Sequence, residues 1–471
     1  MTYTPVQPTA ARPEPLPRPP YRLPLLGDVL TTDFDKPCQR LARQARTLGP
    51  VFEQKLFGYP AVVVTGTQAV AEVNNEAVWE KHVGHVLTKL RPLAGDGLFT
   101  AFNREPNWAK AHNILAPAFG KAAMTTYHDT ITGTVRRLAD VWAAQESTWI
   151  DVPAAANALT FEIMSRAGFS HSFGALTGPD AEPLVAAMVR ELAYANRRTD
   201  VLPRFERVFR RGARRRHQQD LAHAHEVVDA LIDARREQPR RERRDMLDRM
   251  LDDVDPDTGE RLDTTNIRHQ ILTLMVAGSE TSANTIAFAL HYLATHPRIA
   301  DQVRTELDER WPAPDFPDIG YDDVGRLRAL RRVVDETLRL WPTGPGYFRR
   351  AKQDTTLCDG RYRFREKDWV LVLLLAAHRD PAWGPDADEF NPDRFLPDTR
   401  RTLAPHIYKP FGTGPRACIG RQFAHHEIAV TLAVLLHRFD LEPDPAYRLD
   451  VRESLTLKPS GLRLRLHPRS R

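Results

Sequence analysis

One stretch near the C-terminal end constrains this chain more than any other. Residues 411–420 read FGTGPRACIG. Three glycines in ten residues let a backbone turn tightly and approach a flat cofactor closely. A lone cysteine is more often a buried structural residue than a ligand, but Cys418 directly precedes an expected helix, whose N-terminal N–H groups and dipole stabilise a thiolate. Arg416 can pair with a carboxylate of the same cofactor, so the stretch predicts a cofactor site with Cys418 as ligand.

Apolar periodicity predicts a mainly α-helical fold with a minor β component. The segment 79–248 is expected to be mainly helical, and further helices are expected at 34–48, 265–296, 327–340 and 420–437. Strands are expected at 51–57 and 61–64, joined as a hairpin, and around 356–364 and 369–377. The residues 252–263 (DDVDPDTGERLD) are expected to form a loop.

Length and composition fit one large folded domain. The chain has 471 residues, of which 42% are hydrophobic, enough for a large core. The net charge of +5 is small for this length, and no nucleic-acid motif is present. Three widely separated cysteines argue against a disulfide framework. We therefore expect a cytoplasmic monomer with a single domain over residues 25–471 and no nucleic-acid partner.

The N-terminal segment 1–24 is rich in Pro and Arg and is expected to be a flexible arm. It lacks the apolar core of a signal peptide. No segment reaches the roughly 18 apolar residues that span a bilayer, so we expect no membrane partner. The Arg-rich segments 204–216 and 235–244 are either solvated helix faces or patches for an anionic ligand or an acidic carrier protein.

The pattern F-x-x-G-x-R-x-C-x-G resembles the haem-binding loop of the cytochrome P-450 family at every fixed position. The resemblance extends over roughly residues 25–465, in particular to the haem domain of bacterial fatty-acid hydroxylases fused to a flavin reductase, through the stretches AGDGLFT, NWAKAHNIL, ETLRLWPT and LTLKP. It implies a single-domain cytochrome P-450 fold that binds haem b (iron protoporphyrin IX). Cys418 would be the axial thiolate, which favours O–O cleavage, and Phe411 and Arg416 would also contact the cofactor.

The resemblance implies roles for two further motifs. Glu336 and Arg339 share a helix face and alone would be an ordinary ion pair. The resemblance adds Arg394 and implies a buried network that locks the loop presenting Cys418. Trp108 and His112 also share a helix face and alone are equally explained by core packing. The resemblance implies that both donate to a haem propionate.

Two basic residues complete the implied cofactor contacts. Arg349 matches a propionate-binding arginine of many bacterial members of the family, and Lys81 is a further candidate.

The segment AGSET (277–281) lies inside the expected long helix. Alone it is compatible with a core helix that tolerates a glycine. The resemblance implies an oxygen-binding kink in which Gly278 leaves room for dioxygen and Thr281 bonds to its own helix backbone. Glu280 and Thr281 would be the catalytic pair that relays protons. The family's peroxide-driven members lack this pair, which favours dioxygen plus electrons.

Residues of the substrate pocket follow from the resemblance. Phe99 would lie over the haem, although it is otherwise explained as a core aromatic residue, and Gly344 and Gly346 would leave extra space. The other expected pocket residues are Leu90, Ala277, Thr343 and Leu455. The fatty-acid relatives anchor a carboxylate with an Arg and a Tyr where this sequence has Tyr59 and Val63, so a fatty acid and a bulkier biosynthetic intermediate both stay open.

The favoured function is a monooxygenase that inserts one oxygen atom from dioxygen into a small lipophilic substrate. No reductase segment follows in the sequence, so we expect a separate ferredoxin or flavodoxin with its reductase. The basic residues Lys110, Lys409, Arg421 and His425 would steer an acidic partner. The alternatives are a peroxygenase on the same fold and a non-catalytic haem-thiolate sensor, against which Glu280 and Thr281 argue. A carrier-bound substrate also stays open.

Overall fold

The structure is a computed structural model that describes residues 14–144, 148–176, 183–197, 211–238, 244–313 and 317–469. Its contacts divide the chain into two compact units. Unit 1 consists of Met1–His82, Pro345–Asp388 and Thr402–Ala417, and unit 2 consists of Val83–Gly344, Glu389–Arg401 and Cys418–Arg471. The boundary between them passes through the cysteine-containing stretch, directly before Cys418.

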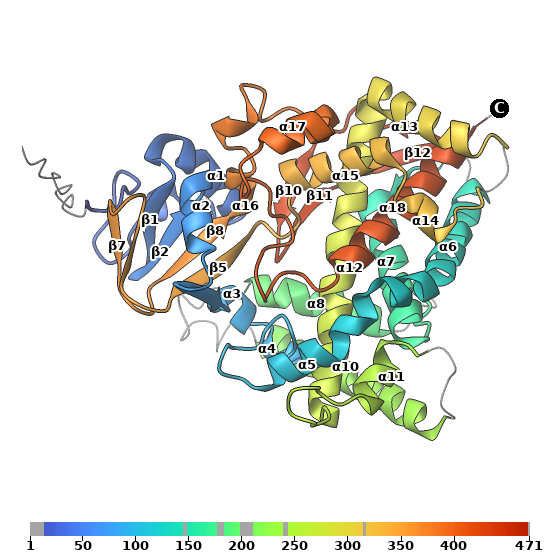
Figure 1. The fold of residues 1–471 in the computed structure, drawn as a ribbon, viewed down its shortest axis with the longest axis horizontal. Helices are drawn as coiled ribbons and strands as arrows, with labels where there is room; N and C mark the ends of the chain where they lie inside the picture. Colours follow the sequence, from blue (N-terminus) through green and yellow to red (C-terminus); the bar gives the residue numbers. More distant parts are fainter. Residues whose placement is uncertain are drawn as a thin grey trace, which may run out of the picture. The chain divides into compact units, whose positions relative to one another are not determined.

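Unit 1 is built on a five-stranded sheet with the order β1-β2-β8-β5-β3. Strands from the two distant sequence segments lie side by side in this sheet (Figure 1). The pair β2–β8 is parallel and the other neighbours are antiparallel. The strands are β1 (Val51–Leu56), β2 (Tyr59–Val64), β3 (Trp79–His82), β5 (Gly346–Ala351) and β8 (Trp369–Leu373). The predicted hairpin is confirmed, with Val51 opposite Val64.

Short elements complete unit 1 around a core that includes Val64, Val70, Trp79 and Val372. They are the hairpin β6 (Thr355–Leu357) and β7 (Tyr362–Phe364), the helices α1 (Pro37–Leu48), α2 (Thr67–Val73) and α16 (Leu374–Ala377), and the 3-10 turns η1 (Val29–Thr31) and η4 (Pro381–Trp383).

Unit 2 is helical, and α12 (Thr264–Thr295) contacts many of its other elements. The Asp263 carboxylate accepts the N–H of Asn266 at the start of α12, and the helix ends just before Pro297. The other helices are α3 (Gly84–Thr88), α4 (Arg91–Ala94), α5 (Asn107–Leu115), α6 (Lys121–Ala144), α7 (Val152–Phe169), α8 (Pro183–Arg197), α10 (Arg211–Glu237), α11 (Met246–Asp252), α13 (Pro297–Arg310), α14 (Tyr321–Val324), α15 (Arg328–Leu340), α17 (Pro397–Thr402) and α18 (Arg421–Arg438).

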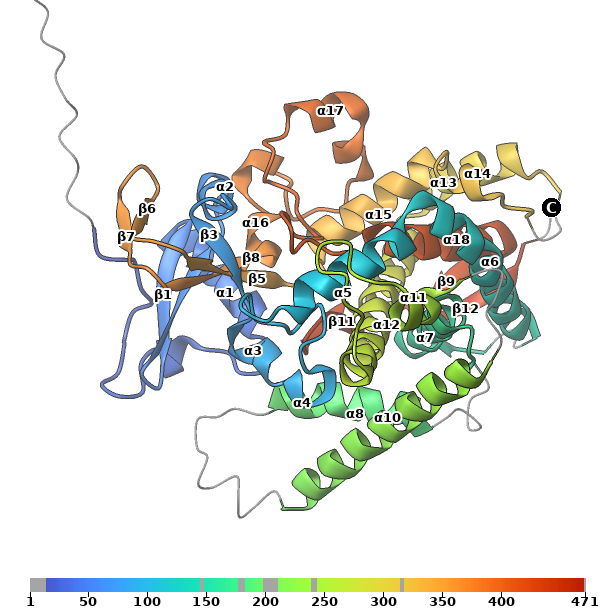
Figure 2. The ribbon, with the colours of Figure 1, turned by 60° about the horizontal axis from the view of Figure 1, so that its bottom comes forward.

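Within unit 2, α7 packs along α12, and α8 and α10 lie side by side (Figure 2). Small strands flank the helices: β4 (Ile150–Asp151), β12 (Arg463–Pro468) and β9 (Phe439–Pro443) form one sheet, and β10 (Asp450–Glu453) pairs with β11 (Leu457–Ser460). Two 3-10 turns, η2 (Ala116–Phe119) and η5 (Pro392–Phe395), complete the unit. In the described parts of the chain, no helix combines the length and apolar character needed to cross a bilayer.

The predicted type of secondary structure was wrong at two short segments, one predicted as helix and one as strand. Residues 79–82 form β3, because their backbone pairs with β5 and long-range pairing overrides local pattern. Residues 374–377 form α16 rather than the end of a strand. The segment 356–364 holds two short strands, β6 and β7, joined by a turn. The predicted helices 34–48, 265–296, 327–340 and 420–437 are present with ends shifted by at most three residues.

The expected N-terminal arm is only partly described, since residues 1–13 lie outside the described residues. Its second half is bonded to unit 1. The carbonyl of Pro17 accepts the N–H of Glu53 at 2.8 Å, and Arg22 pairs with the buried Asp28 at 2.7 Å. The domain boundary at residue 24 stays a prediction.

Candidate functional site

Two glycines form the turns in the unit 1 part of the cysteine stretch. Gly412 and Gly414 have φ angles of 68° and 70°, which glycine adopts without strain. A Cβ atom at Gly414 would lie 2.1 Å from Oε1 of Glu76. Only glycine therefore lets the loop pass this carboxylate.

Glu76 connects the same loop to Arg349 on β5. The Arg349 guanidinium lies 3.0 Å from Oε1 of Glu76 and donates to the carbonyls of Val73 and Trp79, each at 3.0 Å. Arg349 is 3% exposed. These bonds hold the segment between α2 and β3, and the predicted contact of Arg349 with a propionate stays a prediction.

Lys81 on β3 lies near Arg416 of the cysteine stretch. The pKa of Lys81 is far below its usual value because burial disfavours the ammonium ion and the charge of Arg416 repels it. A carboxylate placed near both cations would relieve this repulsion. The electrostatics of unit 1 thus fit an anionic group such as a haem propionate. Phe411, in the same stretch, is half-buried.

Cys418 opens the unit 2 part of the stretch, just before α18. Its thiol pKa is raised because the surrounding protein disfavours the thiolate, whereas the N–H of Gly420 and the charge of Arg421 only partly oppose this. The N–H of Gly420 thus acts in the direction expected of a helix start, and the predicted role of Cys418 as a thiolate ligand stays a prediction. Cys418 is nevertheless an exposed residue, and a bound metal ion deprotonates a coordinating thiol. Cys418 thus fits an axial ligand.

Two aromatic side chains predicted to contact the cofactor lie together on α5. The rings of Trp108 and His112 are stacked, with centroids 5.0 Å apart and an angle of 26° between their planes. The i,i+4 spacing inferred from the sequence therefore places them on one face.

The predicted acid–alcohol pair lies on α12. The Thr281 hydroxyl donates to the carbonyl of Ala277 at 2.8 Å, as expected, while the helix stays continuous. The pKa of Glu280 is raised by burial, and the charge of Lys458 and a hydrogen bond with Thr456 lower it only partly. A carboxyl with a raised pKa holds a proton at higher pH and can donate it.

Gly278 has a packing role that the sequence did not predict. A Cβ atom at this position would lie 2.5 Å from the Cε methyl of Met164 on α7. The glycine therefore leaves room for the Met164 side chain against α12, and its expected role in making room for dioxygen stays a prediction.

The predicted charged network lies together in unit 2. Arg339 donates to both carboxylate oxygens of Glu336 at 2.6 and 2.8 Å, and both side chains are fully buried. Arg394 lies 3.5 Å from the same carboxylate, and the N–H of Asn391 donates to it at 2.8 Å. Arg339 also donates to the carbonyl of Glu389 at 3.0 Å. The network thus joins α15 to the segment around η5.

The expected pocket residues differ in how open they are. Within unit 2, Leu90 and Thr343 are buried, whereas an added Cβ at Gly344 would have nothing within 4 Å. Phe99, Ala277 and Leu455 are half-buried. Gly346, in unit 1, is not surrounded by space: an added Cβ would lie 2.4 Å from the carbonyl of Val372. Gly346 therefore lets β5 pair closely with β8, and the extra space expected above the haem stays a prediction.

The two hairpin positions compared with the fatty-acid relatives carry no positive charge. Tyr59 is 78% exposed and Val63 is fully buried.

Of the basic residues expected to steer a partner, Lys110 pairs with Glu260 at 2.5 Å. Burial and nearby arginines lower the pKa of His425 to about 3, so this side chain is neutral. Most of the first Arg-rich segment, 204–210, and residues 239–243 of the second lie outside the described residues.

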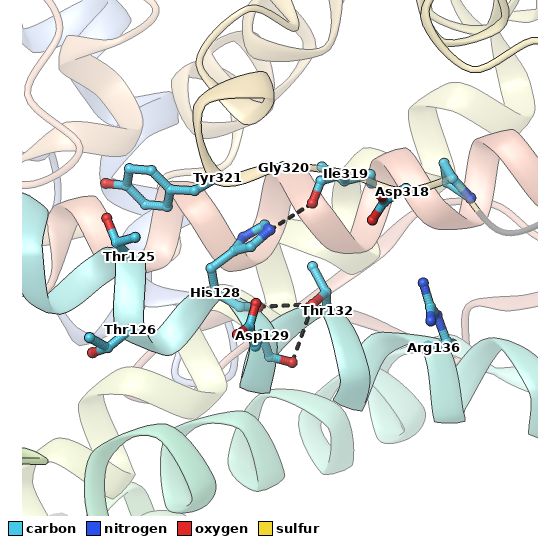
Figure 3. A pocket seen from close by; sticks show the side chains of 11 residues that line it. Thr125, Thr126, His128, Asp129, Thr132, Arg136, Asp318, Ile319, Gly320 and Tyr321 are labelled. Atoms are coloured by element: carbon cyan, nitrogen blue, oxygen red, sulfur yellow. Dashed lines mark hydrogen bonds between the residues drawn. The ribbon is translucent and has the colours of Figure 1, made fainter. Parts of the chain in front are cut away.

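A surface groove of about 470 Å³ lies between α6 and the segment 317–321 of unit 2 (Figure 3). Within it, Nε2 of His128 donates to the carbonyl of Ile319 at 2.7 Å, and Nδ1 of His128 lies 2.9 Å from Nε2 of His426. None of the predicted site residues lines this groove. It does not correspond to the predicted site.

Sequence reasoning missed three polar side chains: Glu76, Thr456 and Lys458. They lie far in sequence from their partners Arg349 and Glu280, and their neighbours form no motif of their own. The sequence held a hint of Thr456 and Lys458 only, because both lie within the LTLKP stretch that resembles the family.

Comparison with known proteins identifies the class. The cytochrome P450 family model matches residues 17–466. The bifunctional cytochrome P450/NADPH–P450 reductases of Bacillus cereus and Bacillus subtilis (reductase 1) are 37% and 36% identical over 94% and 97% of this chain. The crystal structure of a cytochrome P450 (CYP102L1) is 54% identical, covers 98% of this chain and 100% of its own, and superposes with a TM-score of 0.91.

The chain therefore belongs to the cytochrome P450 family, whose members are haem-thiolate monooxygenases. The predicted mainly α-helical cytochrome P-450 fold is confirmed, and haem b is the cofactor of this family. The chain spans about two fifths of the length of the curated relatives it matches, 41% and 42% of those from the two Bacillus species.

Proposed function

We propose that this protein is a dioxygen-dependent monooxygenase of lipophilic organic compounds, with Cys418 as the axial haem ligand. The observation that carries the proposal is Cys418 itself, an exposed cysteine that follows the turns at Gly412 and Gly414 and lies just before α18. Within unit 1, the charges of Lys81 and Arg416 would suit a propionate, and Arg349 is a further candidate. Within unit 2, Trp108 and His112, stacked on α5, would donate to a propionate. Bound haem would supply the activation of dioxygen.

The chain's own residues would manage protons and orientation. Glu280, whose pKa is raised by burial, would store a proton, and the Thr281 hydroxyl, held by the carbonyl of Ala277, would pass it toward the oxygen side of the cofactor. The network of Glu336, Arg339 and Arg394 would keep the segment around η5 rigid. The acid–alcohol pair favours dioxygen over peroxide as the oxidant.

The test is the absorption spectrum of the reduced protein under carbon monoxide. Thiolate-ligated haem gives a far-red-shifted Soret band, which we expect for the wild type and for Thr281→Ala but not for Cys418→His. A folded, haem-loaded wild type without this band would refute the proposal. Turnover driven by peroxide faster than turnover with dioxygen and an electron donor would assign a peroxygenase instead.

We propose further that electrons come from a separate ferredoxin or flavodoxin and that the protein acts as a cytoplasmic monomer. The substrate is proposed to lack an obligatory carboxylate, because Tyr59 and Val63 offer no cation where the fatty-acid relatives have an arginine. Dodecanoic acid and dodecanol separate the two cases by their effect on the Soret band. We expect the alcohol to bind as tightly as the acid, and a clear preference for the acid would contradict this part of the proposal.

A further inference from the structure

The loop between α4 and α5 carries Phe99 and lies directly against α12. Gly95, at the start of the loop, has a φ angle of 45°, and a Cβ atom there would lie 2.1 Å from the ring of His269. A Cβ atom at Gly97 would lie 2.1 Å from the hydroxyl of Thr273. The two glycines therefore allow the loop backbone to touch the helix, which a chain with side chains at these positions could not do.

Asp96, between these glycines, binds three side chains. Its carboxylate accepts from Nδ1 of His269 at 2.7 Å, from Asn266 at 2.9 Å and from Asn107 at 2.7 Å. The hydrogen bond with His269 is the main reason why the pKa of Asp96 falls well below its usual value. Because Asn266 and His269 lie on α12 and Asn107 starts α5, one carboxylate joins the loop to two helices.

A second bond holds the backbone next to Phe99. The N–H of Leu98 donates to Oε1 of Gln270 at 2.9 Å, and Nε2 of Gln270 donates to the side chain of Asn266 at 3.0 Å. Gln270 and Asn266 are 0% and 1% exposed. The hydrogen bonds thus run without a break from Leu98 through Gln270 and Asn266 to Asp96, in an interior where a lost partner is costly.

The same face of α12 carries the proposed oxygen-side residues. Positions 266, 270, 273, 277 and 281 are three or four residues apart, so they form one stripe along the helix. Ala277 follows Gln270 by seven residues, or about 10 Å along the axis. The hydrogen bonds that Asn266 and Gln270 make with the loop therefore fix the position of Phe99 along α12, the helix that carries Ala277 and Thr281.

We infer that Asp96, His269 and Gln270 are positioning residues that hold Phe99 in register with α12 and thereby set which substrates fit. The inference rests on the proposed function, because it assumes that Phe99 limits access to the haem. These three residues would influence substrate specificity without contacting the substrate.

The test uses imidazole and 4-phenylimidazole, a small and a bulky ligand of haem iron, as probes of the haem-loaded full chain. The readout is the ratio of their dissociation constants, measured from absorption spectra. Phe99→Ala should favour the bulky ligand. We expect Asp96→Asn and Gln270→Leu to shift the ratio in the same direction by at least about threefold, a typical coupling between contacting residues. In the Phe99→Ala background, Gln270→Leu should add no further shift.

Asp229→Asn is the matched control. Asp229 pairs with Arg268, the neighbour of His269, at 2.6 Å, and this ion pair joins α12 to α10 instead of the loop. We expect it to leave the ratio unchanged. An unchanged ratio in both Asp96→Asn and Gln270→Leu would overturn the inference, as would an equal shift in Asp229→Asn.

Hydrogen exchange of the loop amides needs no haem. It therefore tests the positioning of the loop independently of the proposed function. We expect faster exchange at residues 95–101 in Asp96→Asn and Gln270→Leu than in the control, and equal exchange in all three proteins would overturn the inference. Failure of the proposed function would appear instead as a wild type without the thiolate carbon monoxide band.

Discussion

At the scale of single residues, Glu427 on α18 is a buried acid that the proposed mechanism does not use. It is 0% exposed, and burial raises its pKa well above the usual value, with Ser282 opposing only in part. The folded protein therefore keeps this proton at a pH where the unfolded chain has lost it. Stability is full below the unfolded pKa and falls as the pH rises toward the folded pKa, by about 1.4 kcal/mol per pH unit for one proton.

Glu427→Gln should remove this pH dependence. Urea unfolding of both proteins at pH 5 and pH 8 checks it, and we expect the variant to gain stability relative to the wild type as the pH rises. A difference in free energy of unfolding that is the same at both pH values would show that Glu427 is already ionised in the folded protein.

Glu336 should be essential for stability, because Glu336→Ala leaves the fully buried Arg339 without its bidentate partner. Breaking a buried ion pair in this way costs about 3–5 kcal/mol. Asp301→Ala is the control: it removes an ion pair of the same i,i+3 spacing with Arg304, but Asp301 is 70% exposed, so less than about 1 kcal/mol should be lost. Equal losses in the free energy of unfolding by urea would mean that the buried Glu336 pair contributes no more to stability than an exposed pair.

At the scale of elements, the contact between α7 and α12 at Gly278 makes a prediction about packing. Gly278→Ala places a Cβ atom 2.5 Å from the Met164 methyl. Because this methyl ends a flexible side chain that can shift, we expect a loss at the low end of the roughly 1–3 kcal/mol that overpacking costs. Met164→Ala in the same chain should recover part of the loss, because it frees the space that the new methyl needs. Urea unfolding of the wild type, both single variants and the double variant measures the coupling, and additive losses would contradict the proposed contact.

Elements with a strong local pattern were predictable, and those formed by pairing were not. The helix α12 was predicted within a residue at each end, because its apolar periodicity, Asp263 cap and terminal Pro297 are all local in sequence. Strand β3 was missed because only its pairing with β5, more than 260 residues away, makes it a strand. Glu76, the partner of Arg349, was invisible for the same reason.

The site was predictable where spacing alone places side chains together. The i,i+4 stacking of Trp108 on His112 and the i,i+3 pair of Glu336 with Arg339 follow directly from helix geometry. Spacing could not reveal that a methionine fills the space beside Gly278 or that Val372 crowds Gly346, since these contacts depend on packing between elements.

At the scale of the whole molecule, the net charge of +5 bears on the proposed electron donor. Long-range attraction between a basic protein and an acidic flavodoxin is screened by salt within about 10 Å at 0.1 M. The exposed Arg421, three residues after Cys418, is a candidate contact, whereas the neutral His425 contributes no charge near neutral pH.

We therefore expect the apparent KM for an acidic flavodoxin to rise several-fold between about 50 and 300 mM salt, and less steeply in Arg421→Gln, because fewer charges are then screened. The dissociation constant of imidazole, a neutral ligand of the same haem, is the control and should not change with salt. A KM that is indifferent to ionic strength would reject electrostatic steering. A salt dependence that is equal in the wild type and in Arg421→Gln would move the contact surface away from the start of α18.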